Sequence, residues 1–476
     1  MSKKIIYLLS LLMALSLVFA SCKKNGAGDI SGTVPDNGFD NSPDTDNGLA
    51  GDSTWLDQNS EKPIKNEQIP FLQSVGGQAY FRNPVVVVMG DTGSDVVVFS
   101  EKRYKSLGAG NDIGIDGKTA VDIVYSSSTD SGKKWNPTKI VGNNGGTEAT
   151  PEKAYASPVV FKVDNTTVVV VASSGVGLSR TETAYDTRVQ NGQSSKLVYT
   201  IGKYSSGSFT WKEWIDMTDT VKDKAAAINN GNFNYKQFAV HSGRGFINGS
   251  DLYFAVSVSD QGTTVNGQVK EAMGNLIVKG NNVTDSSITW AVVDNSGIGF
   301  NDTKNNYSKY KESRVIGMKG TDPEYIAVGS PYYVNNNVGC NVKGNQPVET
   351  TIPGSEGSPA YLKVEKWYGQ ASYNPTTYNS ENPNKSQRLF AHVKSQNNTI
   401  IMYALNGDDG LTSTGKPYTV IGYPTDTTTL AKSSSMDVLG DGTIIMVAEQ
   451  GGATQVYNVV FKRFTQKFLA TQLGLN

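Results

Sequence analysis

Short apolar runs separated by polar turns dominate the chain from residue 78 onward. The runs hold four to eight residues, are rich in Val, Ile, Tyr and Phe, and end at Gly, Asn, Asp or Ser. This pattern is typical of β-strands. Helical periodicity is limited to residues 218–229 and the C-terminal end. The clearest predicted strands are residues 84–90, 95–100, 158–163, 166–173, 250–258, 442–449 and 457–464.

A repeated hairpin end indicates how these strands are organised. Residues 127–135, 205–211 and 285–290 each combine a polar turn with a following tryptophan, and residues 406–413 resemble a degenerate copy. The spacings between Trp135, Trp211 and Trp290 are 76 and 79 residues. They are about twice the length of a four-stranded blade of about 40 residues. An all-β propeller explains the repeats, because radial repetition leaves only short protected strand edges. A β-sandwich is the alternative.

The N-terminus carries an export pattern. Lys3 and Lys4 precede an apolar run over residues 5–20, and small residues stand directly before Cys22. The run is too short for a membrane span. The small pair Ala20-Ser21 directly before Cys22 resembles a bacterial lipobox, which implies a signal peptide over residues 1–21 and acylation of Cys22. Ordinary secretion is the alternative. Residues 22–75 are polar, rich in Gly, Asn and Asp, and are expected to form a flexible tether before a domain over residues 76–476.

Composition narrows the chemistry. The 43 basic and 44 acidic residues give a net charge of −1 without a dense basic run, which argues against nucleic acid as a partner. With Cys22 acylated, Cys340 is the remaining thiol, and no intrachain disulfide is expected. The two histidines, His241 and His392, lie in no HExxH motif, and no GxSxG motif occurs. We expect no metal, no cofactor and a monomer, with any chemistry carried by carboxylates, arginines and tyrosines.

One segment matches a known turn pattern. Residues 128–135 fit the Asp-box consensus Ser/Thr-x-Asp-x-Gly-x-x-Trp. The carboxylate is expected to accept hydrogen bonds across the turn, and the glycine to adopt a conformation that other residues resist. The tryptophan is expected to pack under the blade. This motif is structural and occurs in several kinds of propeller. Its residues here are Ser128, Asp130, Gly132 and Trp135.

The context of this box resembles the bacterial sialidase (neuraminidase) family. YFRNP at residues 80–84 is similar to the Phe-Arg-Ile-Pro element of that family, and VVVFSEKRY at 96–104 to its strand ending in an acidic-x-Arg step. SSSMDVLGDGTIIMVAEQGG at residues 433–452, followed by YNVVFKRF at 457–464, resembles the last blade of that family. The likeness therefore spans about residues 78–464. It implies a six-bladed β-propeller and an exo-α-sialidase that releases terminal sialic acid from glycans or glycoproteins.

The resemblance also implies roles for particular residues. Arg82 aligns with the first arginine of the clamp that grips the sialic-acid carboxylate, and Glu449 with the glutamate that orients it. Arg103 matches an arginine that lines the pocket. Asp112 is the acid/base candidate, with Asp116 as alternate, and Glu312 matches the glutamate that activates a tyrosine nucleophile.

The pattern then departs from the family. Residues 327–332 and 395–403, where the second and third clamp arginines are expected, contain no arginine, and Ser433 stands at the place of the nucleophilic tyrosine. A serine hydroxyl is a poor substitute for a phenol. Arg314 is the substitute guanidinium that we favour. Weaker substitutes are Arg244 and Arg388, and displaced nucleophiles are Tyr332, Tyr333 and Tyr423.

Two functions of different classes therefore stay open. The first is an exo-α-sialidase-type glycosidase with a rearranged clamp. The second is a non-catalytic sialidase-fold lipoprotein that binds glycan or protein. A third hypothesis is an Asp-box propeller unrelated to sialidases. In each of the first two, lipidated Cys22 is expected to anchor the exported protein to a bacterial membrane, with the membrane face left open.

Overall fold

The computed structural model describes residues 64–68, 80–103, 121–142, 155–175, 195–227, 237–265, 268–293, 311–319, 324–330, 339–343, 346–349, 359–365, 367, 386–394, 399–405, 413–421, 430–451 and 457–475. Within these ranges the regular structure is almost entirely β-strand, with two helices, α3 (Thr218–Ala227) and α4 (Gln466–Leu473). The predicted all-β class and both predicted helical positions are confirmed. Neither described helix has the length and apolar character that crossing a membrane requires.

The described strands pair into six sheets. Numbered in chain order, the first three sheets have the following members. The first contains β2 (Tyr80–Met89), β3 (Asp95–Arg103), β4 (Val121–Ser128) and β5 (Lys139–Ile140). The second contains β6 (Tyr155–Lys162), β7 (Thr167–Gly175), β8 (Ser195–Ser205), β9 (Ser208–Trp211), β10 (Ile215–Asp216) and β12 (Gly243–Arg244). The third contains β11 (Gln237–Ala239), β13 (Phe246–Asn248), β14 (Asp251–Val265), β15 (Gln268–Asn281) and β16 (Thr289–Val292).

The remaining three sheets have four strands each. The fourth contains β17 (Lys311–Lys319), β18 (Glu324–Ser330), β19 (Gly339–Lys343) and β20 (Gln346–Glu349). The fifth contains β21 (Ala360–Val364), β22 (Gln387–Lys394), β23 (Thr399–Leu405) and β24 (Ser413–Ile421). The sixth contains β25 (Leu430–Val438), β26 (Ile444–Gly451), β27 (Tyr457–Phe464) and, at its edge, β1 (Ile64–Gln68).

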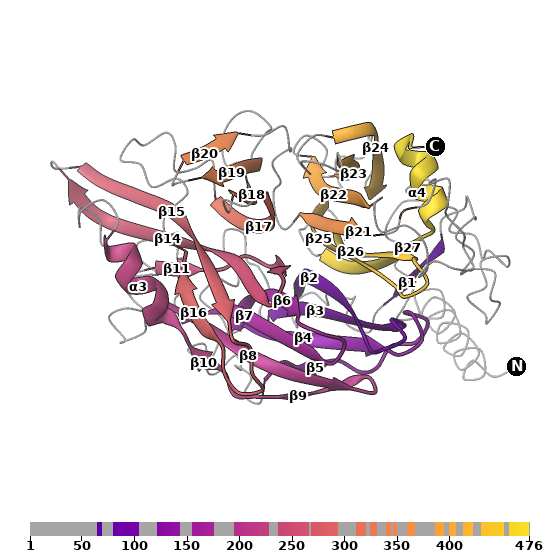
Figure 1. The fold of residues 1–476 in the computed structure, drawn as a ribbon, viewed down its shortest axis with the longest axis horizontal. Coiled ribbons are helices and arrows are strands. Elements are labelled where there is room, and N and C mark those ends of the chain that lie inside the picture. Colours follow the sequence, from indigo (N-terminus) through magenta and orange to yellow (C-terminus); the bar gives the residue numbers. More distant parts are fainter. Residues whose placement is uncertain are drawn as a thin grey trace, which may run out of the picture.

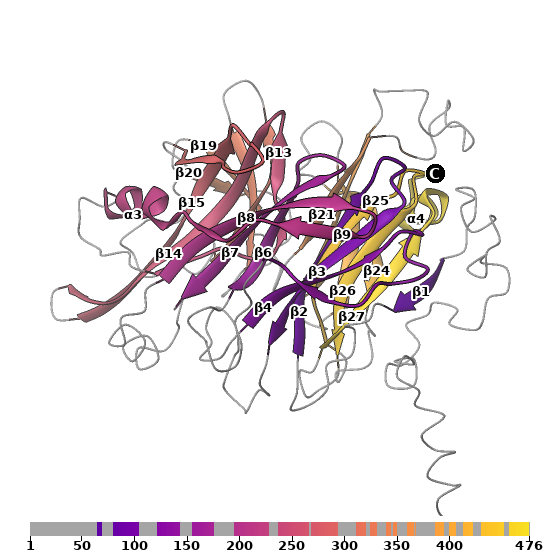
Figure 2. The ribbon, with the colours of Figure 1, turned by 90° about the horizontal axis from the view of Figure 1, so that it is seen from below.

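These sheets follow one another around the centre of the molecule in chain order, as the colours of Figure 1 show, and Figure 2 shows the same strands from below. Strand β2 of the first sheet contacts β6 of the second and β25 of the sixth, so the end of the chain closes on its beginning. This is the arrangement of a β-propeller. The sequence predicted it because its strands are short and evenly punctuated.

The valine runs explain how neighbouring sheets pack. Successive side chains of a strand point to opposite faces. In β2, Val85 and Val87 join a core cluster with the second sheet, whereas Val86 and Val88 join a different cluster with the sixth sheet. Both faces of the strand are therefore buried, and this is why the run is continuously apolar rather than alternating with polar residues.

The blade count differs from the expected six. Large hydrophobic clusters join the first, second, third, fifth and sixth sheets. The fourth sheet enters a described cluster only through Ile316, which packs with Phe390 and Leu405. The arrangement is that of a propeller with five blades, not the six that the resemblance implied. The outer strands of the fourth sheet, GCNVK and QPVE, are short and carry few apolar side chains.

The expected tether over residues 22–75 also needs a correction. Ile64–Gln68 forms strand β1, which pairs antiparallel with β27 at the edge of the sixth sheet. Backbone hydrogen bonds to an open strand edge require no apolar side chains. The polar sequence IKNEQ therefore gave no signal for a strand.

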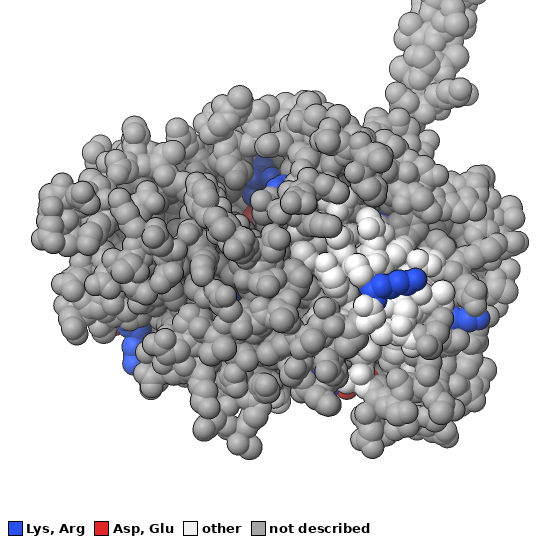
Figure 3. Space-filling view, turned by 90° about the horizontal axis from the view of Figure 1, so that it is seen from above, with Lys and Arg blue, Asp and Glu red and all other residues white. Residues whose placement is uncertain are grey.

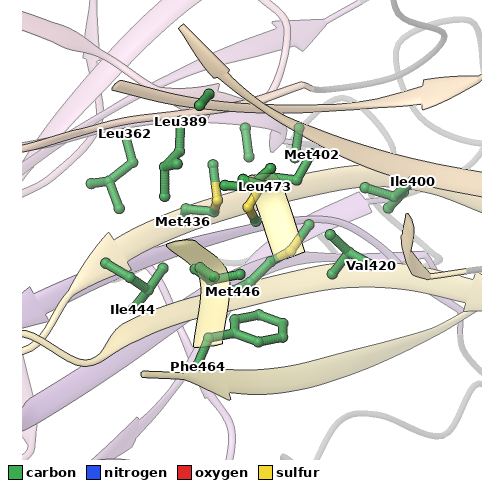
Figure 4. Close-up of a cluster of buried hydrophobic side chains, with 14 of the residues drawn as sticks. Leu362, Leu389, Ile400, Met402, Val420, Met436, Ile444, Met446, Phe464 and Leu473 are labelled. Atoms are coloured by element: carbon green, nitrogen blue, oxygen red, sulfur yellow. The ribbon is translucent and has the colours of Figure 1, made fainter. Parts of the chain in front are cut away.

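The fifth and sixth sheets share the core cluster shown in Figure 4. Helix α4 packs Phe468, Leu469 and Leu473 into it. Thr465 caps the helix by accepting a hydrogen bond from the Phe468 N–H, and Gly474 ends it in the left-handed conformation. The last residues of the chain thereby stabilise the contact between these two blades.

Candidate functional site

Four inner strands begin with an irregularity. The pairing of β2, β6, β17 and β25 with the second strand of each sheet shifts register at Arg82/Val85, Ala156/Val159, Lys311/Arg314 and Ala431/Ser434. Asn83 and Ser157 at two of these bulges have positive φ values of 56° and 58°. We call the end of the ring at which these strands start the bulge end. Bulges redirect side chains, and for this reason they often occur beside functional sites.

Glu449 of β26 organises the junction between the sixth and first sheets. Its carboxylate is fully buried. Arg82 donates Nε to Oε1 at 2.8 Å and Nη2 to Oε2 at 3.4 Å. The backbone N–H groups of Asn83 and Ser433 donate to the same carboxylate. The structure thus brings together Arg82 and Glu449 as the sequence predicted, although 367 positions separate them.

A similar carboxylate joins the first and second sheets. Glu101 of β3 is fully buried and accepts hydrogen bonds from Arg103 Nε at 2.7 Å and from the Ser157 N–H at 2.7 Å. Because the Arg103 side chain is almost completely buried on Glu101, we assign it to this junction. The Arg82 side chain is more exposed, at 16%. Arg82 is therefore the better placed of the two to meet a ligand.

The third junction uses a hydroxyl in the same place. Ser173 of β7 accepts a hydrogen bond from the Val240 N–H at 2.8 Å. Three junctions therefore share one pattern: a side chain near the end of one sheet's second strand binds a backbone N–H of the next sheet. A buried carboxylate can hold a guanidinium in addition to the N–H group, whereas a serine hydroxyl has fewer acceptor sites. Arg82 and Arg103 therefore lie at the two junctions where the acceptor is a glutamate.

Arg314 lies at the next junction along the ring. It is buried on β17, and its Nε donates to the Ser242 carbonyl at 2.7 Å. Gly243 lies next to it, and a Cβ there would be in ordinary van der Waals contact with Arg314 Cδ at 3.4 Å. Nearby, His241 Nε2 lies 2.8 Å from Ser257 Oγ, which donates to Asn275 Oδ1 at 2.6 Å. These buried groups form a polar layer beside the inner strands.

Ser433 occupies the place expected for a tyrosine nucleophile. It is 1% exposed, and its Oγ donates to Asn83 Oδ1 at 2.8 Å. The tyrosine described at the start of β6, Tyr155, stacks on Trp214. Burial and the nearby Asp122 and Glu213 raise the pKa of its phenol. Tyr155 therefore stays protonated near neutral pH and does not provide a phenolate.

The two weaker arginine candidates lie elsewhere. Arg244 forms an ion pair with Asp437, whose carboxylate also accepts the Val88 N–H near the far end of β2. Burial lowers the pKa of Lys162 in the same cluster, and Arg244 adds to this effect while Asp437 opposes it. Arg388 lies at the start of β22, the second strand of the fifth sheet. This strand runs antiparallel to its inner strand, so its start is the end that is farthest from the bulge end. Neither arginine is placed beside Arg82.

Several predicted residues lie outside the described part of the chain. These are Cys22, Asp112, Asp116, Tyr332, Tyr333 and Tyr423. Glu312 belongs to β17, and only its backbone is described. The described residues contain no group of three or more His, Cys, Asp or Glu side chains suited to a metal ion. On the face shown in Figure 3, the described surface carries separate basic side chains rather than a continuous basic area.

The turn over residues 128–135 has the local hydrogen bonds that its sequence predicted. Ser128 Oγ donates to Asp130 Oδ1 at 2.7 Å, and the Lys134 N–H donates to the same oxygen at 2.8 Å. Gly132 has φ 87°, and a Cβ there would collide with Phe461. Trp135 packs edge-on against Phe461 with ring centroids 5.3 Å apart. This turn therefore fastens the first sheet to the sixth.

Sequence reasoning missed Asn83 and Ser157. The signal available was the recurrence of a polar residue before proline at the start of two inner strands, in RNP and ASP. That recurrence marks the two bulges. Their positive φ values and the carboxylates that bind their N–H groups depend on neighbouring sheets, which the local sequence does not specify.

Comparisons with known proteins concern the fold. No protein-family model and no curated protein matches the sequence. The Trypanosoma rangeli sialidase structure matches with TM-score 0.55 at 15% identity over 85% of this chain, and the same enzyme matches in complex with 2,3-difluorosialic acid. This chain spans 59% of that enzyme's length.

Two other solved structures match over nearly their whole length. The intramolecular trans-sialidase of Ruminococcus gnavus, in complex with oseltamivir carboxylate, has TM-score 0.51 at 11% identity, covering 85% of this chain and 98% of its own. A Dyadobacter fermentans protein of unknown function has TM-score 0.53 at 11% identity, covering 84% and 98%. The chain therefore has a β-propeller fold of the kind found in sialidases.

Proposed function

We propose that this protein is an exo-α-sialidase-type glycosidase that binds terminal sialic acid of glycans at the bulge end. The observation that carries the proposal is the Arg82–Glu449 pair. It holds a partly exposed guanidinium at the junction of the first and last blades. A guanidinium whose Nε is held by a buried carboxylate has a fixed plane, and a fixed plane suits the bidentate grip of a carboxylate ligand.

The other proposed roles follow the resemblance to sialidases. Asp112 would protonate the leaving glycosidic oxygen, with Asp116 as the alternate, and Glu312 would activate the nucleophile. Arg314 would supply a second guanidinium, because it is fixed by the Ser242 carbonyl close to the inner strands. Residues 128–135 would act as an Asp box that is structural and takes no part in the reaction.

The second candidate is a non-catalytic protein that uses the same bulge end to bind glycan or protein. The specific observation that favours it is Ser433, which is buried and hydrogen-bonded to Asn83 at the place of the tyrosine nucleophile. Such a protein would bind sialic acid and leave the glycosidic bond intact.

Hydrolysis and binding are tested together with purified protein. We expect release of the fluorophore from a 4-methylumbelliferyl sialoside, and binding of free sialic acid by calorimetry. Arg82→Ala and Arg82→Lys should each weaken binding by about 10- to 100-fold, since a charge-assisted fork contributes roughly 1.5–3 kcal/mol. Arg82→Lys keeps a cation beside Glu449 and therefore preserves the buried ion pair. If ligand binding is lost in Arg82→Lys as well as in Arg82→Ala, the cause is the missing bidentate guanidinium contact and not misfolding.

Arg388→Ala is the matched control, because Arg388 lies at the opposite end of its blade. Its binding and turnover should equal those of the wild type. Sialic-acid binding without fluorophore release would select the non-catalytic candidate. A wild type that neither binds nor cleaves would refute the glycosidase and the glycan-binding form of the second candidate.

We also propose that Cys22 is lipidated and anchors the protein to a bacterial membrane after removal of residues 1–21. The support is the basic segment, the apolar run and the small residues directly before Cys22.

A further inference from the structure

Asn83 and Ser433 are two departures from the sialidase pattern, and they contact each other. Asn83 replaces the isoleucine of the Phe-Arg-Ile-Pro element, and Ser433 replaces the tyrosine. Although 350 positions separate them, Ser433 Oγ donates to Asn83 Oδ1 at 2.8 Å. Both backbone N–H groups also bind Glu449. The two replacements therefore form one unit beside Arg82.

The Asn83 side chain has a defined orientation. Its Oδ1 is occupied by Ser433, so its Nδ2 group, with two N–H donors, points away from this contact. Within the described residues, no group accepts a hydrogen bond from Nδ2, and the side chain is partly exposed. The backbone is fixed as well, since φ is 56° and Glu449 binds the N–H. Asparagine adopts this conformation more readily than most residues.

We propose that Asn83 is a specificity-determining residue whose Nδ2 donates a hydrogen bond to an oxygen of the acidic sugar held by Arg82, and that Ser433 is its positioning residue. This inference rests on the proposed function. The carboxylate of the ligand would meet the Arg82 guanidinium, and a neighbouring oxygen, in the carboxylate or a hydroxyl, would meet the amide. Ser433 donates its proton to Asn83 in this arrangement and acts on the ligand only through it.

The chemistry of the pair makes a charge-specific prediction. An amide donor favours an anionic ligand, whereas a carboxylate at the same position repels it and offers no proton. Asn83→Asp is nearly isosteric and tolerates positive φ, so it changes the charge and little else. Asn83→Gly also tolerates positive φ and removes the donor without adding charge. Ser433→Ala leaves the amide in place and removes the group that orients it.

The experiment measures the affinity of the full-length protein for N-acetylneuraminic acid and for its methyl ester, which lacks the negative charge. We expect Asn83→Gly to weaken binding of the acid by about 5- to 10-fold, the effect of one net hydrogen bond. Asn83→Asp should weaken acid binding by at least about 50-fold and ester binding clearly less. Ser433→Ala should weaken acid binding by about 2- to 5-fold. Thermal unfolding midpoints identify any variant that fails to fold.

The outcomes separate this inference from the function on which it rests. A wild type that binds the acid while all three variants bind it equally well overturns the role of Asn83 and leaves the proposed function intact. Equal losses for acid and ester in Asn83→Asp overturn the charge-specific contact and indicate a structural role only. A wild type that binds neither ligand overturns the proposed function and this inference together.

Discussion

At the scale of single residues, Glu449 has the most consequences for the site. Its buried carboxylate accepts hydrogen bonds from one guanidinium and from two backbone N–H groups of different sheets. These donors compensate for the cost of burying a charge. The same group therefore closes the ring and orients Arg82, so that stability and ligand recognition depend on one side chain.

Replacing Glu449 by glutamine should be strongly destabilising. The amide is neutral, and its NH2 group would face donors that now meet an oxygen. Breaking a buried ion pair of this kind costs about 3–5 kcal/mol in the free energy of unfolding, which urea denaturation measures. Glu365→Gln is the matched control, because Glu365 pairs with Lys363 while 67% exposed. It should change stability by less than about 0.5 kcal/mol. Similar values for both variants would contradict the role assigned to Glu449.

At the scale of elements, glycine–tryptophan pairs explain the repeated hairpins. Trp211 of β9 lies opposite Gly202 of β8, and Trp290 of β16 lies opposite Gly280 of β15. A Cβ at Gly202 would lie 2.5 Å from the Trp211 ring, and one at Gly280 would collide with Trp290. The tryptophan covers the backbone of its partner strand in each case. In these two hairpins the repeat visible in the sequence is therefore a packing unit of the blade, whereas Trp135 packs on Phe461.

Gly202→Ala should displace the Trp211 indole and destabilise the second sheet. Overpacking of a well-filled core costs about 1–3 kcal/mol, measurable by urea denaturation, and the near-ultraviolet circular dichroism of tryptophan should change. Gly249→Ala is the comparison, since Gly249 has a positive φ, of 60°, but a Cβ there would meet nothing within 4 Å. It should lose only about 1 kcal/mol, with the tryptophan signal intact. An unchanged tryptophan signal in Gly202→Ala would show that the indole is not held by this contact.

At the scale of the whole molecule, the ring is closed by residues from both ends of the described chain. Strand β1 pairs with β27, β2 contacts β25, and the turn at residues 128–135 packs on Phe461. Loop-closure entropy makes such non-local contacts slow to form, so folding is expected to depend on the late arrival of the sixth sheet. The junction that joins the first sheet to the sixth is the one that carries Arg82 and Glu449.

Membrane attachment is a prediction about the whole chain. With Cys22 acylated, the wild type should partition into the detergent phase of a Triton X-114 extraction, because the acyl chains are the attachment that the sequence predicts. Cys22→Ser should move the protein to the aqueous phase. Cys340→Ser, which changes the other cysteine, should leave partitioning unchanged. Detergent-phase protein in Cys22→Ser would contradict the lipid anchor.

The sequence by itself determined the strands, the turns and one long-range pair. The valine runs, the tryptophan repeat and the residues of the 128–135 turn act locally, so their patterns are visible in the sequence. The pairing of Arg82 with Glu449 was predicted from the resemblance to a family. In the structure Arg82 Nε lies 2.8 Å from Glu449 Oε1, whereas the role of this pair in ligand binding stays a prediction.

Tertiary structure decided the rest. The sequence did not indicate that Asn83 contacts Ser433, that residues 64–68 join the sixth sheet, or that Arg244 pairs with Asp437. The physical reason is register: a strand shifted by one residue turns each side chain to the opposite face, and a bulge makes that shift locally. Which side chains meet at the bulge end therefore depends on how neighbouring sheets align, and the local sequence does not fix that alignment.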